Sequence, residues 1–130
     1  MQMPSWRWRG VRVERSLQRK LCVDGSLMKE FVLSGPLTMD LAGYLRNFGN
    51  VEILTLHGKQ MLSFEIPRFI SVKGVLGEDT VEVRYVAGVH DLTAELFHLL
   101  LHYYTNGEEV GKMREILVGL EGRIRERLGC

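Results

Sequence analysis

The sequence predicts an α+β fold in which an antiparallel sheet of four to six strands is packed with helices and a coiled-coil-like helix ends the chain. Two observations lead to this prediction. Between residues 51 and 86, apolar and polar residues alternate in short runs separated by turn residues, as in antiparallel strands with one wet face. From residue 91 onward, the apolar residues recur with a helical period.

Length and composition place the chain among ordinary globular proteins. Its 130 residues are enough for one domain with a core, and 45% are hydrophobic while 25% are charged. No apolar run approaches the roughly 20 residues of a membrane span, and no apolar signal core opens the chain. Two cysteines, Cys22 and Cys130, do not make a disulfide framework. We therefore expect a cytoplasmic protein that does not enter membranes.

The first third of the chain predicts three strands. Trp6 to Val13 alternates in strand fashion, with a β-bulge expected at Gly10, where the phase of the alternation changes. A short strand is expected through Leu21 to Val23, ahead of a turn at Asp24-Gly25. Lys29 to Ser34 reads as the next strand.

A helix follows, with Thr38 as its expected N-cap and Gly49 as its C-terminal stop. Its apolar face is expected to comprise Leu41, Leu45 and Phe48. Three or four strands in a meander come next. Their expected ranges are Val51 to Leu56, Gln60 to Ile66, Phe69 to Leu76 and Thr80 to Val86.

Two helices close the chain, from about Asp91 to Thr105 and from about Glu108 to Leu128. We therefore divide the chain into an α+β domain over residues 1–107 and an amphipathic C-terminal helix over residues 108–130. That helix carries apolar residues at spacings of 3 and 4, which is the seam of a coiled coil. The seam comprises Val110, Met113, Leu117, Leu120, Ile124 and Leu128. It predicts self-association into a homo-oligomer, with packing on the chain's own sheet as the alternative.

A polar stripe follows the penultimate helix, where Asp91, Glu95, His98 and His102 lie at spacings of 4, 3 and 4. Glu95, His98 and His102 could hold a metal ion, but an amphipathic helix also needs a wet face, and this stripe is the obvious one. We expect the wet face, with no metal and no other cofactor.

Catalytic motifs are not apparent. The sequence has no nucleophile elbow, phosphate loop, dinucleotide fingerprint or Cys-x-x-Cys pair. Cys22 has no histidine near it in sequence and is expected to be a plain structural residue. The chain is therefore not expected to be an enzyme.

Charge is distributed unevenly along the chain. Residues 1–20 hold six basic residues against one acidic residue, a balance of +5, whereas residues 21–107 sum to −4. In the run Trp6-Arg7-Trp8-Arg9, indole rings alternate with guanidinium groups, and single-stranded nucleic acids are held by aromatic platforms and cations of this kind. Two alternatives remain open: the charges could protect an edge strand, and the tryptophans could fill the core.

A second set of basic and aromatic residues lies in the meander and could extend the same binding surface. The complete predicted nucleic-acid surface comprises Trp6, Arg7, Trp8, Arg9, Arg12, Lys59, Arg68, Phe69, Lys73 and Arg84.

The predicted chain combines a compact sheet with helices, a basic and aromatic strand from Trp6 to Val13, and a zipper-like tail from Val110 to Leu128. In these features it resembles the ThermoDBP-type single-stranded DNA-binding proteins of archaea and their related proteins. The resemblance covers most of the chain and is architectural. It implies a cleft lined by apolar or aromatic side chains and rimmed by basic ones, with assembly through the C-terminal helix.

These observations predict a protein that binds single-stranded DNA or RNA with little sequence specificity, by stacking bases and contacting phosphates. The alternative is a protein-interaction or scaffold module that captures a partner through the C-terminal seam and binds no nucleic acid.

Overall fold

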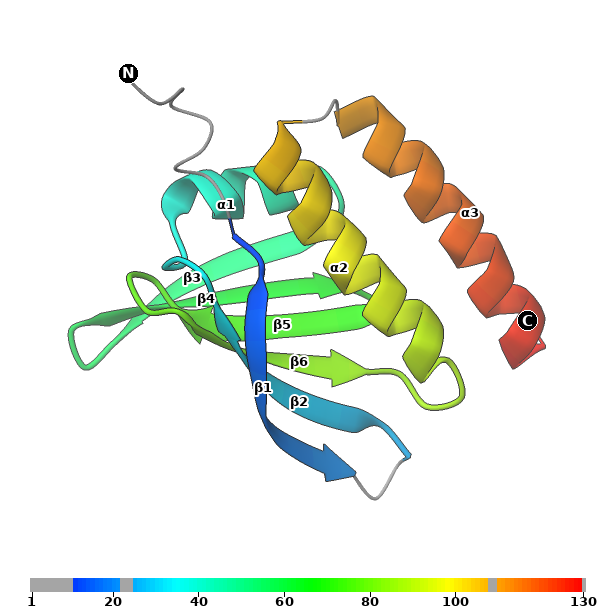
Figure 1. Ribbon diagram of the computed structural model, residues 1–130, viewed down its shortest axis with the longest axis horizontal. Helices are drawn as coiled ribbons and strands as arrows, with labels where there is room; N and C mark the ends of the chain where they lie inside the picture. The colour runs from blue at the N-terminus through cyan, green and yellow to red at the C-terminus, as the bar shows by residue number, and fades with distance from the viewer. Residues whose placement is uncertain (1–10, 22–24, 108–109, 130) are drawn as a thin grey trace.

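The computed structural model describes residues 11–21, 25–107 and 110–129, and shows one sheet with three helices on one of its faces (Figure 1). Six strands form an antiparallel sheet in the order β1-β2-β6-β5-β4-β3. The strands are β1 (Val13–Leu21), β2 (Leu27–Leu33), β3 (Asn50–Leu56), β4 (Lys59–Ile66), β5 (Ile70–Val75) and β6 (Thr80–Tyr85). The helices are α1 (Met39–Leu45), α2 (His90–Asn106) and α3 (Val110–Leu128).

The expected α+β class, the antiparallel sheet and the C-terminal helix are confirmed. Helix α1 begins where its cap predicts, because the hydroxyl of Thr38 accepts a hydrogen bond from the backbone N–H of Leu41 at 3.1 Å. Strands β3 to β6 lie within one residue of their predicted limits at every end. No described helix combines the length and the apolar composition that crossing a bilayer requires.

The start of the chain differs from the prediction. The predicted strand Trp6 to Val13 lies mostly outside the described residues, and β1 instead runs from Val13 to Leu21 at one edge of the sheet. Its pairing with β2 shifts register twice, between Val13 and Arg15 and again between Ser16 and Arg19. Those shifts break the simple alternation from which a strand is recognised in sequence.

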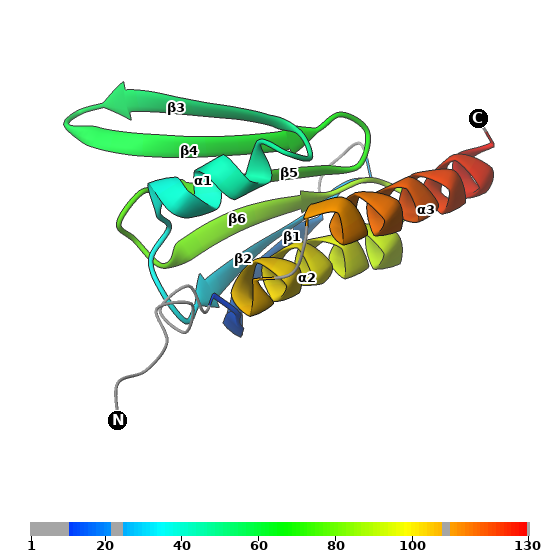
Figure 2. The ribbon, with the colours of Figure 1, turned by 90° about the horizontal axis from the view of Figure 1, so that it is seen from above.

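One continuous core fills the space between the sheet and the helices. Residues at alternate positions of β4, β5 and β6 are buried and belong to one core with the apolar residues of α1 and α2. Figure 2 shows these helices against one face of the sheet. Phe64 and Val83 at the centre of the sheet are fully buried, and Leu96 and Leu100 of α2 are at most 1% exposed. Phe31 of β2 stacks on Phe97 of α2, with ring centroids 5.6 Å apart.

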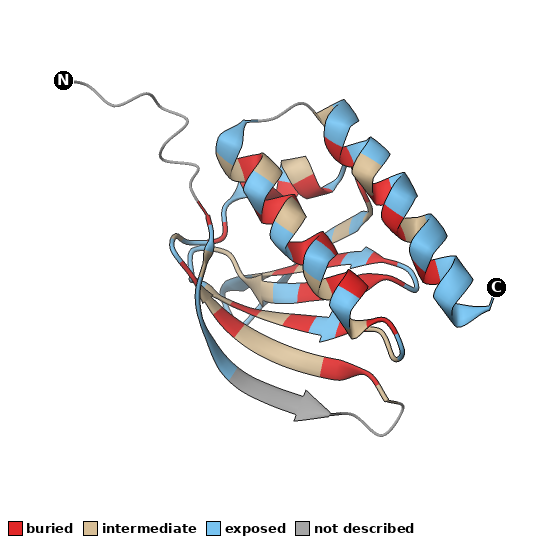
Figure 3. Ribbon diagram, turned by 45° about the vertical axis from the view of Figure 1, so that its right-hand side comes forward, coloured by how far each residue is buried: buried red, intermediate tan, exposed pale blue. Residues whose placement is uncertain are grey.

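The apolar seam of α3 belongs to this core. Met113, Leu117, Leu120 and Ile124 are all buried within the single chain, whereas Leu128 at the helix end is exposed (Figure 3). Helix α3 lies along α2, and Arg123 contacts Glu95 at 3.5 Å while Arg127 contacts Asp91. The prediction of a seam open for self-association is therefore wrong for these four residues, and the alternative of intramolecular packing is the one observed. A core stripe and a short coiled-coil seam share the same spacing, so the sequence alone does not separate them.

Candidate nucleic-acid interface

The face of the sheet opposite the helices carries no covering element among the described residues (Figure 2). Its side chains are fixed by the strand register. In one row across β4, β5 and β6, Glu65 stands opposite Ser71, and Ser71 stands opposite Arg84. In the next row, Ser63 stands opposite Lys73, and Lys73 stands opposite Glu82. The two rows are about 7 Å apart along the strands, since each strand rises about 3.3 Å per residue.

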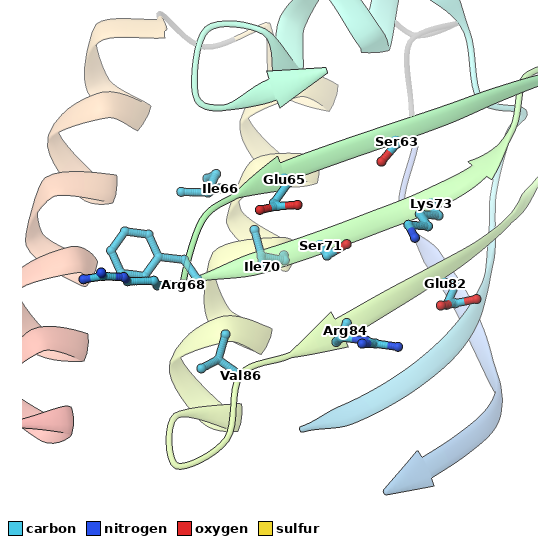
Figure 4. Close-up of a pocket in the computed structure, with 11 residues that line it drawn as sticks. Ser63, Glu65, Ile66, Arg68, Ile70, Ser71, Lys73, Glu82, Arg84 and Val86 are labelled. Atoms are coloured by element: carbon cyan, nitrogen blue, oxygen red, sulfur yellow. The ribbon is translucent and has the colours of Figure 1, made fainter. Parts of the chain in front are cut away.

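These rows line a hollow of about 400 Å³ (Figure 4). It is bounded by Ser63, Glu65, Ile66, Arg68, Phe69, Ile70, Ser71, Lys73, Glu82, Arg84 and Val86. A second hollow of about 280 Å³ shares Lys73 and Glu82 with the first and continues toward Met61, Val75 and Thr80. The open face is therefore hollowed along much of β5 and β6.

Cations without a carboxylate partner distinguish the first hollow. It holds Arg68, Lys73 and Arg84 against two carboxylates, Glu65 and Glu82. Within the described chain, none of the three cations has a carboxylate oxygen within 4.0 Å. Cations elsewhere are often paired. Arg12 meets Glu14 at 3.1 Å, and Arg125 meets Glu121 at 3.8 Å. The cations of the hollow are exposed and available to an anionic ligand.

The backbone at Arg68 has an unusual conformation. This residue follows Pro67 in the turn between β4 and β5 and has φ = 72°, in the left-handed region that favours glycine. A non-glycine residue in that region stores of order 1 kcal/mol of strain, and such positions cluster at functional sites. The fold tolerates that strain, and the side chain of Arg68 extends away from Lys73 and Arg84, at the outer end of the hollow (Figure 4).

The predicted surface is only partly assembled. The hollow is lined by Arg68 from the β4–β5 turn, Lys73 from β5 and Arg84 from β6. Lys59 lies at the β3–β4 turn, where it contacts Glu78 at 3.5 Å, and Glu78 lines the second hollow. Arg12 lies beside β1 at the far edge of the sheet. Trp6, Arg7, Trp8 and Arg9 lie outside the described residues.

Phe69 does not provide a stacking platform. Its side chain is only 8% exposed and belongs to the core cluster. The backbone carbonyl of Phe69 accepts a hydrogen bond from the buried hydroxyl of Thr93 at 3.0 Å, which anchors this turn to α2. Phe69 precedes β5 and is buried, so it does not share the open face with Ser71 and Lys73.

Sequence reasoning missed the polar side chains between the cations. Ser63, Ser71, Glu65 and Glu82 line the hollow with hydroxyl and carboxylate groups. They alternate with the buried residues of the same strands, so the strand period does predict that they share the open face. Only the order of strands in the sheet makes them neighbours.

The polar stripe of α2 does not line the hollow, and its two acidic residues contact α3. Asp91 and Glu95 contact arginines of α3, and the hydrogen bond from Arg127 holds the pKa of Asp91 below its usual value. His98 lies beside the rings of Phe31 and Phe97, and burial together with the nearby charge of Lys29 lowers its pKa. The side-chain amide of Asn106 lies 3.0 Å from Nε2 of His102. In the described residues, no three His, Cys, Asp or Glu side chains gather as a metal site would require.

Comparisons with protein-family models, with curated proteins and with solved structures find no match for this chain. The ThermoDBP-type resemblance therefore stays a prediction from the sequence, and the function must be argued from the site itself.

Proposed function

We propose that the chain binds single-stranded nucleic acid, DNA or RNA, on the open face of its sheet. The observation that supports this most is that one hollow is lined by Arg68, Lys73 and Arg84, none of which has a carboxylate partner among the described residues. Single strands are bound in grooves that present cations to the phosphates. Phosphates contacting these cations would lie along β5 and β6.

The other groups of the hollow suit the bases. Hydroxyls of Ser63 and Ser71 both donate and accept hydrogen bonds, and the carboxylates of Glu65 and Glu82 accept them from exocyclic amino groups. The carboxylates also repel phosphates, so they keep the backbone of the strand near the cations. Such polar contacts tolerate several bases, which agrees with binding of low sequence specificity.

Stacking is assigned to Trp6 and Trp8 by the sequence alone. No aromatic side chain of the described residues is exposed in the hollow, because Phe69 is buried. The proposal therefore separates into a phosphate-binding part on the sheet and a stacking part on the N-terminal residues. Trp6→Ala and Trp8→Ala test the second part independently of the first.

A titration with a fluorescently labelled, unstructured oligonucleotide, as DNA and as RNA, tests the sheet surface. Affinity should fall steeply as salt increases, because cations released from the phosphates contribute to binding. Arg84→Gln and Lys73→Gln should each weaken binding and lower the slope of log affinity against log salt by about 0.7.

Arg125→Gln is the matched control. Arg125 is an exposed arginine on α3, on the other side of the molecule, where it contacts Glu121. This variant should bind as the wild type does. Absence of binding to either nucleic acid at low salt would refute the proposal, and equal losses in the Arg125→Gln and Arg84→Gln proteins would show that only overall charge matters.

A further inference from the structure

The two edges of the sheet differ in how they are protected. Strand β1 is broken by two register shifts and carries the charged residues Glu14 and Arg15. Register shifts and charges are the devices by which natural edge strands avoid pairing with another chain. Strand β3 has neither protection: it pairs with β4 over seven consecutive residues without a shift, and Glu52 is its one charged residue.

Exposed leucines add to the contrast. Leu54 and Leu56 of β3 are 55% and 54% exposed, and both point to the open face of the sheet. Leu54 stands opposite Met61 of β4, which stands opposite Val75 of β5, so the apolar row runs inward from the edge. Within the described chain, β3 has no backbone partner other than β4.

We propose that the free edge of β3 pairs antiparallel with β3 of a second copy of this chain, about a two-fold axis near Thr55. This register sets Leu54 of each copy opposite Leu56 of the other on the open face. It also sets the two Thr55 side chains opposite each other on the inner face, a favourable cross-strand pair. The apolar row from Val75 through Leu54 then continues into the second copy.

Charge complementarity supports a second copy as the occupant. In the same register, Glu52 stands opposite Gly58 of the second copy, and the next residue there is Lys59. Glu52 and Lys59 both lie on the open face, since Lys59 pairs with Leu56 and side chains alternate along β3. Each copy therefore brings the carboxylate of Glu52 toward the ammonium group of Lys59 in the other copy, which within its own chain contacts Glu78 at 3.5 Å. A two-fold axis generates both contacts at once.

Light scattering over a range of protein concentrations tests the pairing. We expect the wild-type chain to reach the mass of a dimer, and Leu54→Lys and Leu56→Lys each to raise the dissociation constant about tenfold or more, because each places a charge in an apolar contact. Leu17→Lys is the matched control: Leu17 is 47% exposed on the protected edge strand β1, and its replacement should leave the dimer unchanged.

A charge exchange tests the register. Glu52→Lys and Lys59→Glu should each weaken the dimer, whereas the double variant Glu52→Lys/Lys59→Glu should regain it, since opposite charges again meet across the axis. Both side chains are exposed in the single chain, and Lys59→Glu removes only the exposed contact with Glu78, so folding should survive each change.

Hydrogen exchange locates the contact. Between dilute and concentrated protein, amide protection should increase in β3 and not in β1 or α3. A wild type that stays monomeric at every concentration overturns the proposal. A dimer that resists Leu54→Lys, or a double variant that dimerises no better than the single variants, overturns it as well.

Discussion

Arg68 combines a charge at the rim of the hollow with a strained backbone, and the two properties can be separated by mutation. Arg68→Gly removes the guanidinium group and supplies the residue that φ = 72° favours. We expect the free energy of unfolding to rise by up to about 1 kcal/mol while affinity for single-stranded nucleic acid falls. Urea denaturation and oligonucleotide titration of the same protein sample measure both effects.

Arg68→Lys distinguishes charge from conformation. It keeps a cation and the strain, so it should restore most of the affinity without the gain in stability. If Arg68→Gly is less stable than the wild type, then the left-handed conformation is not a cost at this position.

His98 gives the fold a pH dependence just below neutrality. Burial, and then the charge of Lys29, lower its pKa below 6.5, so the unfolded chain takes up this proton more readily than the folded chain. The contribution of His98 to the free energy of unfolding is therefore fully present above pH 6.5 and decreases as the pH drops below that value. Urea denaturation at pH 7.5 and at pH 5 measures this decrease. We expect the free energy of unfolding to fall less between these two pH values in His98→Gln than in the wild type.

Two comparisons check that cause. Lys29→Gln removes the charge that, after burial, lowers the pKa of His98. The free energy of unfolding of this variant should therefore change less between pH 7.5 and pH 5 than that of the wild type. Asp91 acts in a different window, because its pKa lies below 3.8 and its pairing with Arg127 is lost only at more acidic pH. If the free energy of unfolding of His98→Gln falls as much between pH 7.5 and pH 5 as that of the wild type, then groups other than His98 cause the pH dependence.

At the scale of the elements, glycines in α3 and β5 have opposite roles. A Cβ added at Gly122 of α3 meets no atom within 4 Å, whereas one added at Gly74 of β5 would lie 2.4 Å from Cδ1 of Leu37 and 3.0 Å from the carbonyl oxygen of Thr80. Gly122→Ala should therefore stabilise the protein by about 0.5–1 kcal/mol, through better helix propensity. Gly74→Ala should destabilise it by about 1–3 kcal/mol through overpacking.

Thermal and urea unfolding of both variants measure these changes, and Gly119→Ala provides a second open position on α3. A loss of stability in both α3 variants would mean that the outer surface of this helix is covered in solution.

The elements show which parts of the fold local patterns determine. Strict alternation and short turns predict β3 to β6 closely, and the Thr38 cap predicts the start of α1. Strand β1 escaped prediction because its register shifts disrupt the alternation that identifies a strand. The seam of α3 was detected but misinterpreted, since periodicity shows that a face is apolar and not which surface covers it. Likewise, Arg68, Lys73 and Arg84 were predicted individually, but only the strand order brings them to one hollow.

At the scale of the whole molecule, the two proposals combine into one geometric consequence. A two-fold axis between antiparallel β3 strands is perpendicular to the sheet, so the open faces of both copies lie on the same side. Five strand spacings separate one β5 from the other, about 24 Å across the strands. Thr55 is level with Leu76 through Gln60, about four residues along the chain from the middle of the hollow. The two-fold axis therefore also displaces the hollows by about 26 Å along the strands, which places them about 35 Å apart. One strand of nucleic acid could then occupy both hollows.

An oligonucleotide long enough to span that separation should bind the wild type at least about tenfold more tightly than one that fills a single hollow, because the second contact becomes intramolecular. Leu54→Lys should abolish this gain without lowering the affinity for the short oligonucleotide, since Leu54 is not part of the hollow and the new side chain is itself a cation. Arg84→Gln should weaken both oligonucleotides while preserving the dimer. A length dependence that persists in monomeric Leu54→Lys would mean that a single chain contacts the longer strand beyond its hollow, and that dimerisation and binding are independent.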